Sequence, residues 1–252
     1  MAYYLIISLP FFIFFSRLLL TNFIVPHFKR KSLYTQMKQR SDWPMLEKTE
    51  NILKKLFRGD HAKMTSIIYR NFRRMTNKEL IYGEINFLSF HNILENAQPK
   101  LGDVFYDLGS GTGKAVFTAA LFFDLSKACG IELLPPLYEK ANNQLKKAIS
   151  FFQNLKPDLE NKYLEKTPAI QFIQDSFLTY DFHDANIIYI AATCLSDPTW
   201  ESLINKMAHL NPGTRIIVAS KSIQHKQFEM IYQGIELMSW GLCPVKIYRK
   251  LP

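Results

Sequence analysis

The sequence has few cysteines and no pattern of metal ligands. Its three cysteines, Cys129, Cys194 and Cys243, lie far apart in a chain of 252 residues. Their odd number and wide spacing argue against a disulfide framework, and none of the spacings typical of a zinc site occurs. We therefore interpret them as small apolar residues, and the sequence predicts no metal centre.

Acidic residues are scarce in the first third of the chain. Residues 1–80 hold 15 Lys or Arg and only 5 Asp or Glu, whereas residues 81–252 hold 16 and 17. The net charge of +9 therefore belongs to the N-terminal region, and the rest of the chain is close to neutral. The basic region suits contact with anionic lipid, nucleic acid or an acidic protein, or it forms a solvated helical face.

A long apolar run lies at the N-terminus. Residues 3–26 have about the length that a bilayer core requires, although Pro10, Arg17 and Asn22 interrupt them. No basic residue precedes the run and no small-residue cleavage site follows it, which favours a retained anchor over a signal peptide. The basic stretch that comes next, HFKRKS, predicts that the rest of the chain faces the cytoplasm.

The remaining chain alternates strand-like and helix-like segments. Buried strands are expected at 103–108, 127–133, 169–177, 185–194 and 214–221, with amphipathic helices between them and two further strands around a turn near the C-terminus. Repeated βα units predict an α/β fold with a doubly wound, Rossmann-like sheet, mostly parallel with an antiparallel C-terminal hairpin. The predicted organisation is an N-terminal hydrophobic helix as anchor (1–27), a basic helical linker (28–78) and a catalytic domain (79–252).

The glycine loop VFYDLGSGTGK, residues 104–114, excludes two common phosphate-binding motifs. A P-loop needs a hydroxyl after Gly113-Lys114, and Ala115 stands there. A dinucleotide fingerprint needs Gly or Ala at its last place, and both possible frames put Lys114 or Val116 there.

A third motif, D-x-G-x-G-x-G, fits the loop and is the first motif of class I S-adenosylmethionine methyltransferases. Asp107 can receive the ammonium group of such a cofactor, and Gly109, Gly111 and Gly113 allow a close approach of the backbone. Glu132 ends the next strand, where the ribose hydroxyls require a carboxylate, and Asp175 ends the third strand, where the adenine amine requires an acceptor. Three acids at successive strand ends predict S-adenosyl-L-methionine as the cofactor.

Several segments between Tyr82 and Tyr248 resemble the disruptor-of-telomeric-silencing family, histone-lysine methyltransferases that lack a SET domain. The segments are YGEINF, the glycine loop, GIELLPPLYEKA, the run from NIIYIAATC to IVASK, and SWGLCPV. The resemblance implies methyl transfer from S-adenosyl-L-methionine to a lysine amine of a protein, in a narrow apolar channel. It implies catalytic roles for Tyr82 and Trp240. The cofactor-binding set that it and the acids predict is Glu84, Asp107, Gly109, Ser110, Gly111, Gly113, Glu132, Asp175 and Ser176.

Five residues at three places depart from the family pattern. Ala191-Ala192-Thr193 replaces an Asn-Asn-Phe run, Ile247 stands where the family has a channel tyrosine, and Lys114 stands where it prefers glutamine. We expect Tyr248, one residue further on, to face the other side of the sheet. The basic nucleosome-binding tail of the family is absent from the sequence.

Because of these departures, the sequence is compatible with more than one function. Membrane-anchored lysine methyltransferases of the mitochondrial ATP-synthase and nucleotide-translocase type share a hydrophobic N-terminus and a similar loop. A methyltransferase of a small molecule or lipid would also fit, as would a non-catalytic scaffold that binds the cofactor. The predicted partners are a protein with an accessible lysine and a membrane contacted through residues 3–26; contact with nucleic acid or a nucleosome is compatible with the basic region, but no specific motif supports it.

Overall fold

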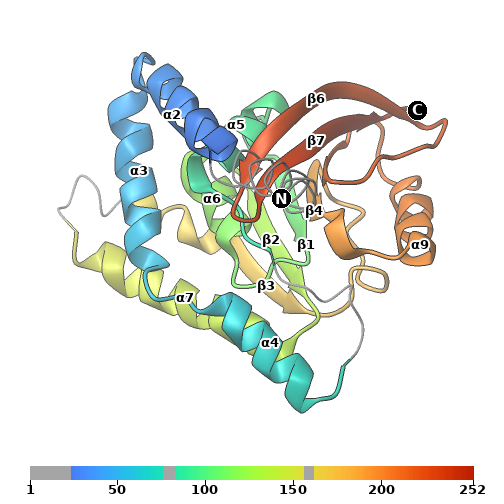
Figure 1. Ribbon diagram of the computed structural model, residues 1–252, viewed down its shortest axis with the longest axis horizontal. Coiled ribbons are helices and arrows are strands. Elements are labelled where there is room, and N and C mark those ends of the chain that lie inside the picture. Colours follow the sequence, from blue (N-terminus) through green and yellow to red (C-terminus); the bar gives the residue numbers. More distant parts are fainter. Residues whose placement is uncertain (1–23, 76–82, 156–161) are drawn as a thin grey trace, which may run out of the picture.

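The computed structural model describes residues 24–75, 83–155 and 162–252. In these ranges the sheet has seven strands in the order β3-β2-β1-β4-β5-β7-β6, of which β1 to β5 are parallel and β7 and β6 form an antiparallel hairpin (Figure 1). This arrangement confirms the predicted α/β class, the parallel sheet and the C-terminal hairpin. The strands are β1 Val104–Leu108, β2 Lys127–Glu132, β3 Ile170–Gln174, β4 Ile187–Ala191, β5 Arg215–Ala219, β6 Phe228–Met238 and β7 Gly241–Lys250.

Helices cover both faces of the sheet. Within the described residues, four α-helices precede β1, two separate it from β3, and one lies between β4 and β5. They are α2 Val25–Lys38, α3 Trp43–Leu56, α4 Ala62–Phe72, α5 Phe87–Asn96, α6 Lys114–Phe122, α7 Pro135–Gln153 and α9 Asp197–Met207; short 3₁₀ turns, η3 Thr167–Ala169 and η4 Ala192–Cys194, flank β3 and β4.

Alternating residues of each strand enter two different cores. Phe105 of β1 lies in the core with α3, α5, α6 and α7, whereas its neighbour Tyr106 lies in the core with α9. The same alternation puts Ile247 in the first core and Tyr248 in the second, as the sequence predicted. The Tyr248 hydroxyl accepts a hydrogen bond from the Ile223 amide at 3.1 Å, so it serves the far face of the sheet.

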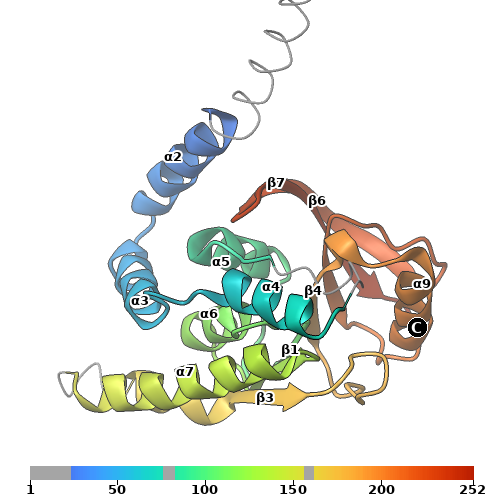
Figure 2. The same ribbon diagram turned by 60° about the horizontal axis from the view of Figure 1, so that its bottom comes forward.

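The basic N-terminal region is helical, and part of it belongs to the core. Leu53 of α3 is fully buried and packs in the same cluster as Phe117 of α6. Helix α4 packs beside α7, where Ala62 lies against Leu134 and Leu137 (Figure 2). The region therefore contributes to the stability of the domain as well as preceding it.

The predicted anchor lies almost entirely outside the described residues. Within 24–75, 83–155 and 162–252, no helix combines the length and the apolar character needed to cross a bilayer. The three cysteines are free, as expected, and no cluster of metal-ligating side chains occurs in these ranges.

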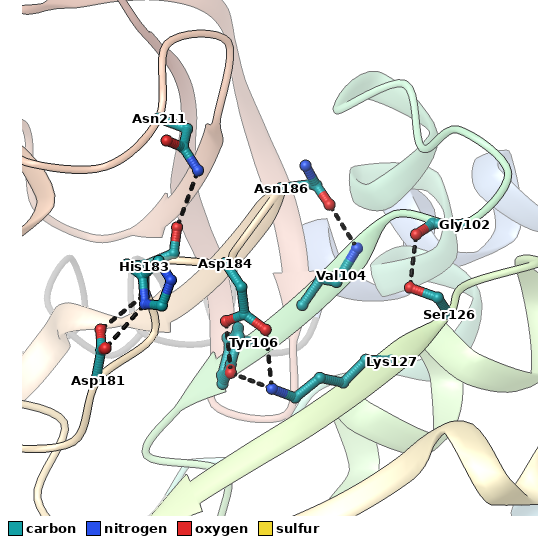
Figure 3. A network of polar contacts seen from close by, with 10 residues as sticks. All are labelled: Gly102, Val104, Tyr106, Ser126, Lys127, Asp181, His183, Asp184, Asn186 and Asn211. Atoms are coloured by element: carbon teal, nitrogen blue, oxygen red, sulfur yellow. Dashed lines mark hydrogen bonds and ion pairs between the residues drawn. The ribbon is translucent and has the colours of Figure 1, made fainter.

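A partly buried polar network closes the amino-terminal edge of the sheet. The Tyr106 hydroxyl donates to Asp184 at 2.8 Å and accepts from Lys127, and the Val104 amide donates to Asn186 at 2.8 Å (Figure 3). These contacts join the starts of β1, β2 and β4. The carboxyl edge is therefore the one where side chains remain available for a ligand.

Gly113 connects the sheet to α6 under two constraints. Its φ of +89° is left-handed, and a Cβ at this position would lie 2.4 Å from the Phe172 ring. Gly213 has a similar φ of +90°, but a Cβ there would meet nothing within 4 Å. A side chain at Gly213 would meet only the strain of the left-handed backbone, whereas one at Gly113 would meet that strain and a steric clash as well.

We expect Gly113→Ala to lower the free energy of unfolding by about 2–4 kcal/mol and Gly213→Ala by only about 1 kcal/mol. Both variants have the left-handed φ, whereas only the first forces Phe172 to move. Urea unfolding followed by circular dichroism measures the difference. Equal losses in the two variants would show that the contact with Phe172 adds nothing.

Candidate active site

The glycine loop folds back over β2 at the carboxyl edge of the sheet. Gly109, Gly111 and Gly113 all have positive φ, at +90°, +55° and +89°. The Gly109 and Ser110 amides both donate to the carbonyl of Ile131, at 2.9 and 3.0 Å. Because a Cβ at Gly109 would meet nothing within 4 Å, the loop leaves open space above it for a ligand.

Asp107 is a buried carboxylate beside this loop. Its side chain is 4% exposed, and among the described residues it receives no hydrogen bond. Loss of hydration raises the pKa of Asp107 well above its ordinary value, and repulsion from Glu132 raises it further. A ligand that brings a cation to Asp107 would therefore relieve an existing electrostatic cost.

Glu132, the last residue of β2, holds the loop in place. Its Oε2 accepts from the Gly111 amide and its Oε1 from the Leu134 amide, both at 2.7 Å. Burial raises the pKa of Glu132, while these amide hydrogen bonds oppose the rise. Each carboxylate oxygen keeps a further lone pair, so the residue can also accept hydrogen bonds from a diol.

Asp175 and Ser176 come directly after β3, next to Glu132. The Asp175 amide donates to the Glu132 carbonyl at 3.2 Å, which places the third predicted acid beside the second. However, Oδ1 of Asp175 accepts from the Ser176 amide and the Thr179 hydroxyl, at 2.6 and 2.9 Å. Asp175 therefore also caps its own turn, and its Oδ2 is the atom that remains for a ligand.

Gly83 and Glu84 contact the turn between β6 and β7, which carries Trp240. The Glu84 amide donates to the Ser239 hydroxyl at 3.1 Å, and the Ser239 amide donates to the Glu84 carbonyl at 3.0 Å. The Trp240 ring lies so close to Gly83 that a Cβ there would be 2.7 Å from it. The Tyr-Gly-Glu segment and the β6–β7 turn are thus held together, although Tyr82 itself lies outside the described residues.

Lys114, which directly follows the glycine loop, links that loop to Glu84. It is the first residue of α6, and its ammonium forms an ion pair with Glu84. Both side chains are mostly buried, at 13% and 23% exposure. The residue that the family pattern did not explain therefore neutralises one of the predicted cofactor-binding acids.

A cluster of hydroxyl and thiol groups marks the ends of β4 and β5. Thr193 Oγ1 lies 2.8 Å from Ser220 Oγ, which lies 3.2 Å from Cys243 Sγ. Ser220 has a φ of +78°, a conformation that is costly for a residue other than glycine and that often marks functional sites. Sequence reasoning missed this cluster, because its members come from three segments and their only signal was the Ser-Lys ending of the fifth strand.

The arrangement fits a ligand with a cationic group, a diol and a flat aromatic part. Asp107 is a buried acid with a raised pKa, and the buried Ser110 hydroxyl has no hydrogen-bond partner among the described residues. A Cβ at Gly130 would lie 2.5 Å from this hydroxyl, so the absence of a side chain there makes room for it. These features suit the predicted S-adenosyl-L-methionine and require no metal.

Comparison with known proteins gives one family and several distant folds. The model of a family described as "Histone methylation protein DOT1" matches residues 64–239, and no curated protein matches the chain. An RNA methyltransferase from Salinibacter ruber, solved with S-adenosyl-L-homocysteine, is 21% identical over 64% of this chain and 90% of its own, with a TM-score of 0.49. A putative methylase from Haemophilus influenzae is 16% identical over 65% and 99%, with a TM-score of 0.46. An rRNA methyltransferase from Streptomyces viridochromogenes is 14% identical over 67% and 86%, also with a TM-score of 0.46.

The buried Asp107 predicts an unusual dependence of stability on pH. Its folded pKa lies above the ordinary value of 3.8, so its contribution to stability is complete below that pH and is lost as the pH rises through the folded pKa. Asp107→Asn removes this loss. We expect the variant to exceed the wild type in free energy of unfolding by about 1 kcal/mol or more at pH 7.5.

Urea unfolding of both proteins between pH 4 and pH 8, without ligand, measures this difference. The gap between the two curves should widen with rising pH. Parallel curves, or a variant that is less stable throughout, would contradict the assignment of Asp107 as a carboxylate held at a cost.

Proposed function

The chain belongs to the histone methylation protein DOT1 family, and from this premise we propose that it is an S-adenosyl-L-methionine-dependent methyltransferase of protein lysine. The family model covers residues 64–239, which include the glycine loop and every acid of the candidate site. The observation that carries the proposal is that Asp107 and Glu132 lie beside the glycine loop on the neighbouring strands β1 and β2, at the edge of an α/β sheet where ligands bind.

The residues present can hold the cofactor along its whole length. Asp107 would pair with its ammonium group, the loop from Gly109 to Gly113 would face its methionine part, and Glu132 would accept from its ribose hydroxyls. Asp175 and Ser176 would lie at its adenine amine. When bound, the cofactor supplies a methyl group on a sulfonium, which is an electrophilic carbon with a neutral leaving group.

The protein must hold the substrate amine in its neutral form and in line with that methyl group. Trp240, which packs on Gly83, provides an apolar wall on which a lysine stem can lie. Loss of hydration against such a wall lowers the pKa of the lysine and favours its nucleophilic form. An amine held in this way could take the methyl group from the sulfonium, with the carbon–sulfur electron pair returning to sulfur and the surplus proton of the methylated ammonium passing to solvent.

The acceptor side offers hydroxyl groups where the family resemblance implies an amide. Thr193 and Ser220 lie 2.8 Å apart at the ends of β4 and β5. Their oxygens can accept a hydrogen bond from the incoming amine. This supports an amine substrate, whereas the identity of the protein that carries it comes only from the family.

We expect labelled methyl groups to enter lysine side chains of protein. The full-length chain is incubated with methyl-labelled cofactor and either a cell lysate or a membrane fraction, and the modified residue is identified by mass spectrometry. Asp107→Asn should bind the cofactor at least about 100-fold more weakly, because it loses a charge-assisted contact, and should transfer no label.

Label in extractable lipid or in a small molecule would replace the lysine substrate with one of those classes. A folded wild-type protein that binds no S-adenosyl-L-methionine in calorimetry would remove the enzymatic proposal altogether. Binding without transfer to either fraction would favour a non-catalytic scaffold.

We also propose that the N-terminal segment tethers the chain to a membrane, with the catalytic domain on the cytoplasmic side. The apolar run continues into the first turn of α2, where Ile24, Val25 and Phe28 are 44%, 37% and 64% exposed. Lys29, Arg30 and Lys31 follow directly. Exposed apolar residues next to basic ones suit the boundary between acyl chains and anionic headgroups.

Removal of residues 1–23 should move the protein from the membrane pellet to the supernatant after fractionation, because the apolar run supplies the membrane affinity. The matched control keeps the run and replaces Lys29, Arg30 and Lys31 with Gln, which should leave the protein in the pellet. Accessibility of a C-terminal tag to protease, before and after the cells are opened, reports orientation. A truncated chain that still sediments with membranes would contradict the tether.

A further inference from the structure

Tyr189 lies directly beside Asp107 in the sheet. It belongs to β4, and the parallel register pairs it with Asp107 of β1. Residues paired in this way point to the same face of the sheet, so the two side chains are neighbours. The position of Tyr189 is therefore set by the strands and does not depend on a loop.

The Tyr189 hydroxyl is buried and has no hydrogen-bond partner in the described part of the chain. The residue is 3% exposed, and its ring packs edge-on against Phe90 with centroids 4.6 Å apart. Among the described residues, no donor or acceptor reaches its oxygen. Buried polar groups in native proteins are nearly always satisfied, so an exception points to a partner other than the described residues, and a ligand at the neighbouring site is one.

A second tyrosine in the same sheet shows how this chain treats a buried hydroxyl away from the site. Tyr106 is 1% exposed, and its hydroxyl donates to Asp184 at 2.8 Å and accepts from Lys127 (Figure 3). It faces the opposite side of the sheet, in the core with α9. The hydroxyl of Tyr106 is hydrogen-bonded within the chain, whereas that of Tyr189 is not, and a bound ligand could supply the missing partner.

We propose that Tyr189 is a further cofactor-binding residue, whose hydroxyl accepts a hydrogen bond from the ammonium group that Asp107 holds. The proposal rests on the proposed function, since it requires a ligand with an amino-acid end. An ammonium group has three donors, and the carboxylate of Asp107 need take only one or two of them. A neutral hydroxyl next to that carboxylate is suited to take another.

The local chemistry keeps Tyr189 in the form that the proposal needs. Loss of hydration, with smaller contributions from Asp107 and Cys243, raises the pKa of Tyr189 well above its ordinary value. Its oxygen therefore retains both a hydrogen and free lone pairs throughout the physiological range. The hydroxyl adds no second negative charge beside Asp107, so it binds the ammonium without adding to the repulsion between carboxylates.

Calorimetric titration of Tyr189→Phe with two ligands tests the proposal. S-adenosyl-L-homocysteine carries the amino-acid end, whereas 5′-methylthioadenosine carries only the adenosine and the sulfur. We expect the variant to bind the first about 10- to 100-fold more weakly than the wild type, as for loss of a hydrogen bond to a charged group. Its affinity for the second should stay within about twofold of the wild type.

Tyr106→Phe is the matched control, because it removes the same atom from the same sheet. It should lower the unfolding temperature, since Asp184 and Lys127 lose a partner, and should leave both affinities unchanged. Tyr189→Phe should not lower the unfolding temperature, since it removes an unsatisfied group.

Two results would overturn the assignment of Tyr189. One is an unchanged affinity of Tyr189→Phe for S-adenosyl-L-homocysteine, and the other is an equal loss for both ligands, which would indicate general distortion of the site. Failure of the wild-type protein to bind S-adenosyl-L-homocysteine is a different result, since it would overturn the proposed function and the role of Tyr189 with it.

Discussion

Two carboxylates buried side by side, Asp107 and Glu132, are the constraint around which the site is organised. Glu132 is compensated by two backbone amides, and through one of them it holds the glycine loop against β2. Asp107 has no such compensation in the described chain, and its pKa is raised by burial and by Glu132. Burial of the Asp107 carboxylate therefore destabilises the unliganded fold, and a cationic ligand group that pairs with it would bind more tightly for that reason.

The rest of the site holds the segments around the buried Asp107 in place. The ion pair between Lys114 and Glu84 connects the start of α6 to the segment that precedes α5, and the hydrogen bonds of Glu84 with Ser239 extend the connection to the β6–β7 turn. Parts of the chain that are 155 residues apart are joined in this way. A mostly buried ion pair is costly when one partner is lost, so these parts hold their relative position through Lys114.

The sequence was most informative where one strand or one loop decides the outcome. The mostly apolar segments VFYDL and NIIYIA predicted buried parallel strands correctly, because burial on both faces leaves a simple signal. Asp107 and Glu132 could be placed at strand ends from the sequence, because each directly follows or ends such an apolar segment. Asp175 falls just outside β3 and Thr193 lies in a 3₁₀ turn after β4, because the hydrogen-bond ladder ends before the apolar pattern does.

What the sequence could not reveal are contacts between distant segments. Nothing near Lys114 indicates that its partner is Glu84, and nothing near Tyr189 distinguishes its unpaired hydroxyl from the satisfied one of Tyr106. Both facts depend on register and on rotamers that are set by packing. The functional roles of Tyr82 and the membrane tether remain predictions, since both fall outside the described residues.

The acceptor side shows how the site can change its hydrogen-bonding groups while keeping its architecture. Ala191 and Ala192 are smaller than the amides that the family resemblance implies, so the ends of β4 and β5 lose polar reach but gain space. The hydroxyls of Thr193 and Ser220 lie 2.8 Å apart at these strand ends, and Ser220 adopts a strained backbone conformation while its amide donates to the Pro244 carbonyl at 2.9 Å. Because strain of this kind persists only when the surrounding contacts enforce it, the hydroxyl pair is held in place by the fold itself. An amine that enters beside Trp240 would therefore meet acceptors whose positions are set before it binds, which is the condition for catalysis by orientation.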